Sequence, residues 1–128
     1  MRDLTSNIRA IAAVAPAVQS ASVNGTAIDL KDAGRVAFVL NTGAIVSAGD
    51  FSAKIQESDT TTSGDFADVG EALFDSDAPA TLEATSTYKL GYRGFKRYVR
   101  LVLTKAGGTS IAAGAVAVLS DLAERPEA

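Results

Sequence analysis

Polar and apolar residues alternate most clearly over residues 96–104. Every second residue from Val99 to Leu103 is a large aliphatic one, and basic or apolar residues of the opposite face stand between them. Such alternation is typical of a strand that buries one face. Residues 87–93 predict a second strand directly before this one. The sequence therefore predicts a central β-hairpin over residues 88–104.

Similar patterns predict further strands. Residues 35–41 are apolar on both faces, which is typical of a central strand. Residues 51–58 alternate, and residues 111–119 form a closing strand of small side chains. Turn-forming residues separate these segments. Among them is the pair Asn24-Gly25, which favours the type I′ turn of a tight hairpin.

Short strands separated by turns, without a long helical pattern, predict an all-β fold. The expected architecture is a jelly-roll-like antiparallel β-sandwich with an N-terminal arm. We expect residues 1–20 to form this arm or a first strand, because Pro16 ends any helix there. Residues 21–128 form a single β-sandwich domain in this interpretation. The 11 glycines, the single Met and the absence of Trp suit thin, closely packed sheets.

The charge of the chain is unevenly distributed, although its net value is only −3. Residues 50–83 carry acidic side chains with Lys54 as the one base, whereas residues 89–105 carry bases and no acid. One account is that the two segments neutralise each other inside one fold. The other is a bipolar surface that meets a complementary face on a neighbouring copy or a partner.

The composition predicts neither an enzyme nor a metal or cofactor site. Histidine and cysteine are absent, which removes the commonest general base and the thiolate ligands. Ser52 and Lys54 share a strand face, a commonplace arrangement. The remaining candidates for glycoside hydrolysis or calcium binding are loop carboxylates that match no defined motif: Asp59, Asp65, Asp68, Asp75 and Asp77. No segment approaches the roughly 20 apolar residues of a membrane-spanning helix.

Residues 88–105 combine aromatic and basic side chains, which is also the composition of surfaces that bind single-stranded nucleic acid. The acidic remainder of the chain argues against this function, because such proteins usually present a net basic footprint. The alternative interpretation is that the aromatic rings are half-buried partners across strands and receive arginines on their faces. We therefore favour a structural role for residues 88–105 over nucleic-acid binding, and a single-stranded nucleic-acid-binding module that uses these residues stays the alternative function.

Three stretches together resemble small structural proteins encoded in the head gene clusters of tailed bacteriophages and prophages. They are Ile-Gln-Glu-Ser-Asp at residues 55–59, Gly-Asp-Phe-Ala-Asp-Val at residues 64–69, and Tyr-Lys-Leu-Gly-Tyr-Arg-Gly-Phe-Lys-Arg-Tyr-Val-Arg at residues 88–100. The Arg125-Pro126 pair is similar to the end of those proteins. The resemblance covers residues 29–126, and its most specific part is the third stretch.

The resemblance implies a head decoration (cement) protein without catalytic activity or cofactor. Such a protein is made in the host bacterial cytoplasm, lies on the capsid surface of the virion, and binds the major capsid protein as a homo-oligomer, a dimer or a trimer. A neck or tail location is the alternative within the virion. The interface candidates are Tyr88, Tyr92, Arg93, Phe95, Arg97, Tyr98 and Arg100, with Ile8 and Ile11 of the arm.

Overall fold

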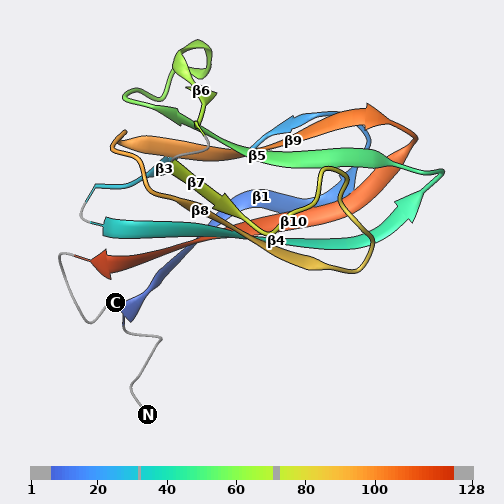
Figure 1. Cartoon of the computed structure of the whole chain (residues 1–128), viewed down its shortest axis with the longest axis horizontal. Helices are drawn as coiled ribbons and strands as arrows, with labels where there is room; N and C mark the ends of the chain where they lie inside the picture. The colour runs from blue at the N-terminus through green and yellow to red at the C-terminus, as the bar shows by residue number, and fades with distance from the viewer. Residues whose placement is uncertain (1–6, 32, 71–72, 123–128) are drawn as a thin grey trace.

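The computed structural model describes residues 7–31, 33–70 and 73–122 of the chain. Two antiparallel β-sheets pack face to face, and Figure 1 shows them as an upper layer with β5 and β9 and a lower layer with β4 and β10. A short 3₁₀ turn, Ser63–Asp65, lies between β5 and β6. Among the described residues, no helix has the length and apolar character needed to cross a membrane.

Each sheet has a mixed order of early and late strands. Sheet A has the order β1 (Arg9–Gln19), β10 (Ser110–Leu122), β4 (Ala33–Val46), β8 (Thr87–Tyr92) and β7 (Phe74–Ser76). In sheet B, β9 (Tyr98–Gly107) lies between β5 (Asp50–Ser58) and two short strands, β2 (Val23–Asn24) and β3 (Ile28–Asp29). The outer partner of β5 is β6 (Ala67–Asp68).

This strand order is that of a jelly roll. Strands β2 and β3 both pair with β9 and act as two parts of one broken strand. The chain then passes from one sheet to the other between most successive strands, and the first strand lies beside the last. Two sheets interleaved in this way are the arrangement of a double-sheet jelly roll. The predicted fold class, an all-β jelly-roll-like antiparallel sandwich, is confirmed.

The N-terminal segment forms a strand where the structure describes it. Strand β1 pairs with β10 along its length, with register shifts on either side of Val14. Residues 1–6 of the expected arm lie outside the described residues, as does the Arg125-Pro126 pair. Strand β1 is thus an edge of sheet A, and its interruptions suit an edge strand, where a bulge or a proline limits further pairing.

The predicted hairpin over residues 88–104 is wrong. Strand β8 pairs with β4 and β7 in sheet A, whereas β9 pairs with β5 in sheet B. The connecting residues 93–97 therefore cross from one sheet to the other. The alternation was interpreted correctly, because Val99, Leu101 and Leu103 are fully buried. Alternation fixes which face of a strand is buried, but two strands on opposite walls of one core have the same pattern as two neighbours.

The type I′ turn at Asn24-Gly25 is also absent, because β2 and β3 line up along β9 and do not pair with each other. Gly25 has a different role. A Cβ atom there would lie 2.5 Å from the carbonyl oxygen of Leu101 and 2.7 Å from that of Ala13. Its own N–H donates to Leu101 at 2.7 Å. Glycine permits this close approach between chain segments from both sheets.

The core lies between the sheets and follows the predicted strands. Strand β4 is central in sheet A, as expected for residues apolar on both faces. The large, fully buried side chains come from both sheets: Phe38, Leu40, Leu90, Ile111 and Leu119 from sheet A, and Ile28, Phe51, Ile55, Leu101 and Leu103 from sheet B. Truncating any one of the aromatic or leucine side chains to alanine costs about 2–5 kcal/mol.

Candidate interaction surface

The crossover between β8 and β9, residues 93–97, forms one end of the sandwich. Its backbone is held by three hydrogen bonds. The N–H of Arg93 donates to the carbonyl oxygen of Leu73 at 2.7 Å, and the carbonyl oxygen of Arg97 accepts from the N–H of Leu30 at 2.8 Å. The N–H of Lys96 donates to the hydroxyl of Tyr92 at 3.0 Å. This connection is therefore fixed at both of its ends.

Tyr92 joins the two sheets beneath this crossover. It belongs to β8 of sheet A and is 7% exposed. Its hydroxyl donates to the Oε1 atom of Glu57 on β5 of sheet B, at 2.6 Å. Burial, together with the hydrogen bond to Glu57, raises the pKa of Tyr92 to about 12. Tyr92 is a strut between the sheets, and it stays protonated at neutral pH.

The position of Tyr92 explains why residue 94 is a glycine. A Cβ atom at residue 94 would lie 2.3 Å from the Tyr92 hydroxyl and 2.6 Å from a ring carbon. Both distances are below any ordinary contact, so a larger residue would displace either the ring or the crossover. Gly94 therefore permits the chain to turn closely over Tyr92 on its way to sheet B.

Ion pairs hold the basic side chains of the crossover. The three pairs come from three separate segments: Arg93 with Asp75 at 2.8 Å, Lys96 with Asp59 at 3.0 Å, and Arg97 with Asp29 at 3.0 Å. Arg97 bonds Asp29 through two nitrogens, which lowers the pKa of that carboxyl. In these pairs the basic segment is neutralised within the fold, partly by the acidic segment.

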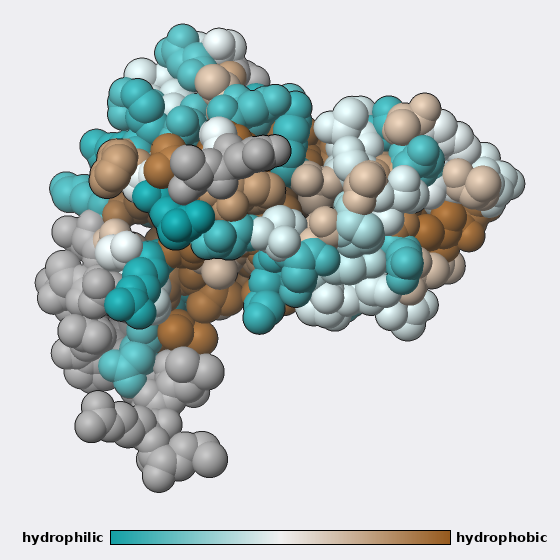
Figure 2. Space-filling model, in the orientation of Figure 1, coloured by the Kyte–Doolittle hydropathy of each residue, from teal (hydrophilic) through white to brown (hydrophobic). Residues whose placement is uncertain are grey.

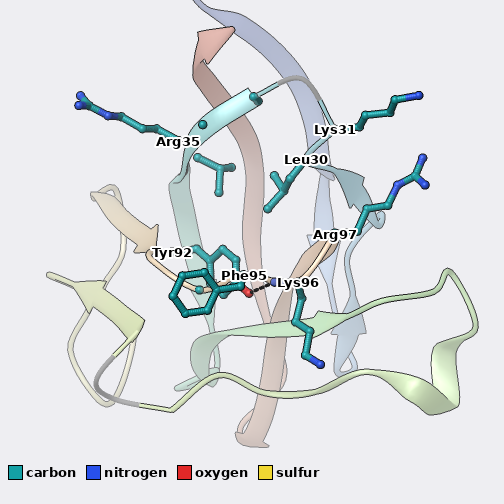
Figure 3. A pocket seen from close by; sticks show the side chains of 11 residues that line it. Leu30, Lys31, Arg35, Tyr92, Phe95, Lys96 and Arg97 are labelled. Carbon is teal, nitrogen blue, oxygen red and sulfur yellow. Dashed lines mark hydrogen bonds between the residues drawn. The ribbon is translucent and has the colours of Figure 1, made fainter. Parts of the chain in front are cut away.

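Phe95 lies at the tip of the crossover and is 94% exposed. It borders a hollow of about 460 Å³ whose rim carries the bases Lys31, Arg35, Lys96 and Arg97. Figure 3 shows these four side chains directed outward around the hollow. Lys31 and Arg35 make no ion pair with a carboxylate of the described residues.

The structure brings some of the predicted interface residues together at this end. Ile8 borders a second hollow of about 830 Å³ together with Tyr92, Arg93 and Phe95. Arg97 lies over the ring of Tyr98, 5.1 Å from its centroid. Ile8 precedes β1, whereas the other residues lie in or beside the crossover between β8 and β9.

The other predicted interface residues lie elsewhere. Tyr88 is 8% exposed, and its hydroxyl accepts a hydrogen bond from the N–H of Glu83. Arg100 is equally buried, with its guanidinium 4.3 Å from the ring of Phe66 and bonded to Gln56. Ile11 packs against the core. Tyr88, Arg100 and Ile11 therefore leave little surface for a partner.

Sequence reasoning missed Lys31 and Arg35 as members of this surface. They lie near β3 and at the start of β4, far along the chain from Phe95. Their only sequence signal was a basic character close to a turn. It could not place them beside residues 93–97 because that proximity depends on the crossover between sheets.

A second exposed apolar feature lies on the outer face of sheet A, along β1, β10 and β4. A groove of about 580 Å³ is bordered by small and aliphatic residues, including Pro16, Val18, Val39, Gly114 and Val116, and by no charged side chain. Val18 is 68% exposed.

Figure 2 shows that, in its view, hydrophilic residues gather over the half with β6, while the opposite half is mostly of intermediate hydropathy.

The acidic residues proposed for chemistry are engaged in structural bonds. Asp65 accepts from the Thr60 hydroxyl at 2.7 Å, and Asp68 bonds both Lys54 and Gln56, which lowers its pKa. Within the described residues, no group of three or more acidic residues is placed to hold a metal ion.

Comparison with known proteins leaves the family of the chain open. No family model matches the sequence, and no curated protein matches it. Among solved structures, a chain from "Structure of infectious bursal disease virus Gx strain" is similar over 88% of this chain, with 16% identity and a TM-score of 0.43. The chain spans only 32% of that one's length. At this TM-score the likeness supports no assignment, so the fold rests on the strand order itself.

Proposed function

We propose that the protein is a structural component of a bacteriophage virion, a decoration protein that binds capsid subunits as a homo-oligomer. The observation that carries this proposal is a jelly roll with two exposed apolar features, the tip of the crossover at Phe95 and the groove on sheet A. Exposed apolar surface of this kind marks contacts with other proteins. The resemblance of residues 88–100 to phage head proteins supports the same proposal.

The groove on sheet A supports the homo-oligomeric part of the proposal. It is uncharged and its lining residues come from three strands, β1, β4 and β10, so a second sheet could pack over it with the usual face-to-face spacing of about 10 Å. Multivalent attachment by an oligomer then turns modest single contacts into high avidity.

The nucleic-acid alternative has less support. Single-strand binding needs several exposed rings on which successive bases stack. Of the aromatic residues in the segment, Tyr88 and Tyr92 are buried, and three of its bases are already paired with carboxylates. A neck or tail position on the virion uses the same surfaces as a capsid position, and only the virion itself distinguishes the two.

The proposal is tested on virions of the phage that encodes the chain. We expect mass spectrometry of purified particles to detect the protein in stoichiometric amounts, and particles from a deletion mutant to lose their DNA at a lower temperature. Absence of the protein from virions, or unchanged resistance of the mutant particles to heat and chelator, would contradict the proposal.

The homo-oligomer is tested by placing a charge in the groove. Val116→Glu buries a carboxylate at any contact across β10, and we expect it to weaken self-association at least ~10-fold. Val46→Glu, at a similarly exposed position outside the groove, is the matched control. Analytical ultracentrifugation measures both, and a Val116→Glu protein that associates like the wild type would exclude this face.

A further inference from the structure

We propose that Phe95 is the anchor of the contact with the partner, and that the partner offers an apolar pocket rimmed by carboxylates. This inference rests on the proposed function and deepens it, because the partner there is a capsid subunit. It names the attachment surface: Phe95 at the centre, with Lys31, Arg35, Arg93, Lys96 and Arg97 around it.

The first argument is the exposure of Phe95. Its side chain is 94% exposed, more than any other large hydrophobic residue that the structure describes. A single exposed Leu or Val is ordinary, but a full phenyl ring at the tip of a loop keeps a large apolar surface in water. Buried in a partner's pocket, one such ring at the centre of a contact supplies much of the binding free energy.

The second argument is that the ring stands on a fixed support. The backbone on both sides of Phe95 is hydrogen-bonded to Leu73, Tyr92 and Leu30. Gly94 lies directly against Tyr92, which is itself bonded across the core to Glu57. Little conformational entropy remains to be lost at this loop on binding, and such pre-organisation strengthens association.

The third argument is the charge around the ring. Five bases surround Phe95. Three of them are paired with Asp29, Asp59 and Asp75, and Glu57 lies beneath the crossover on the Tyr92 hydroxyl, so the bases outnumber these carboxylates by one. The whole chain has a net charge of −3, so this end differs in sign from the protein as a whole. A partner with carboxylates around an apolar pocket matches both the ring and its surroundings.

The experiment uses capsid shells purified from a phage that lacks the gene. Wild-type protein, Phe95→Ala and Val46→Ala are titrated onto the shells at several salt concentrations. Val46 is the control because it is also exposed but lies at the end of β4 far from Arg35 and Phe95. We expect Phe95→Ala to bind at least ~30-fold more weakly and Val46→Ala to bind within about twofold of the wild type.

Charge reversal separates the contribution of the rim. Arg35→Glu should slow association about threefold to tenfold at low salt, and the difference should fade as salt screens the surface. Neither Phe95 nor Arg35 supports the core, so the variants should fold as the wild type does, which circular dichroism verifies.

The outcomes are distinguishable. If wild type binds the shells and Phe95→Ala binds equally well, the inference is overturned and the proposed function stands. If wild type does not bind, the proposed function fails. The third arm is a fluorescent oligothymidylate: tight, salt-sensitive binding that Phe95→Ala abolishes would overturn the carboxylate-rimmed partner and assign this surface to nucleic acid.

Discussion

The two ends of the sandwich are built in different ways. The Phe95 end, residues 93–97 with the bases and acids around them, relies on side chains: three ion pairs and the Tyr92 strut. The opposite end, where residues 47–49 and 108–109 connect the two sheets, relies on close backbone contacts of glycine. We call it the glycine end (Figure 1). Strand β4 runs from the first end to the second, as its pairs Val36 with Tyr92 and Val46 with Ser110 show.

The difference indicates that the two ends have different roles, one in stability and the other in binding. At the glycine end, a Cβ atom on Gly108 would lie 2.1 Å from the carbonyl oxygen of Ala48, and one on Gly49 would lie 2.2 Å from that of Ser110. Such contacts are tight and tolerate almost no change. At the Phe95 end, exposed ion pairs contribute little free energy, and one aromatic residue stays in water. We therefore expect the glycine end to govern stability and the Phe95 end to govern binding.

The largest effect should come from Gly108→Ala. Gly108 has a φ of +73°, and its new methyl group would collide with the backbone at Ala48. We expect a loss of about 3 kcal/mol or more in the free energy of unfolding, measured by urea denaturation. Gly107→Ala is the matched control, because a Cβ atom there meets nothing within 4 Å. It should change the free energy by less than about 0.5 kcal/mol; equal losses in both variants would contradict this account.

A smaller effect is expected from Tyr92→Phe at the other end. The change removes one hydroxyl, which strips Glu57 of a donor and the N–H of Lys96 of its acceptor. We expect a loss of about 1–2 kcal/mol. Tyr98→Phe is the control, because the Tyr98 hydroxyl has no hydrogen-bond partner among the described residues. A Tyr92→Phe protein as stable as the control would show that the strut is dispensable.

The same residue predicts a dependence on alkaline pH. The pKa of Tyr92 in the folded protein is about 12, above its ordinary value of 10.0, so the unfolded chain releases this proton first as pH rises. The stability that Tyr92 contributes is fully present below about pH 10 and is lost between about pH 10 and 12. Urea denaturation across this range should show a steeper loss for the wild type than for Tyr92→Phe, and parallel curves would contradict the prediction.

The smallest effect should come from the ion pair of Arg97 with Asp29. The bonds from Arg97 hold the pKa of Asp29 below its ordinary value of 3.8, so their contribution is present at neutral pH and is lost as pH falls through the lowered pKa. Both side chains are about half exposed, which limits the effect. Asp29→Asn should be slightly less stable than wild type at pH 7 and equally stable in strong acid, as thermal unfolding would show.

Much of the fold follows from the sequence, because alternation identifies which residues of a strand face the core. Residues 51–58 are predicted and observed as a strand, and residues 35–41 lie at the centre of sheet A as expected. The alternation does not predict which strands pair with each other. Residues 88–104 appear as two adjacent strands with a glycine-containing connection, and nothing local distinguishes a hairpin from a crossover between sheets.

The candidate surface was predicted only where it is local in sequence. Phe95, Arg93 and Arg97 follow from the composition of one segment, whereas Lys31 and Arg35 reach the same place through the fold. The sequence also did not predict that Tyr88 and Arg100 are buried, because their burial depends on segments distant in the chain, such as the loop that contains Phe66.

The central claim is that the crossover holds Phe95 in a fixed position although its ring is exposed. Backbone ¹⁵N relaxation of the full chain tests this most directly. The account predicts an order parameter near 0.85 for the amide of Phe95, close to that of the strands it joins. A value below about 0.6 would mean that the loop is flexible, and it would contradict the claim that the anchor is pre-organised.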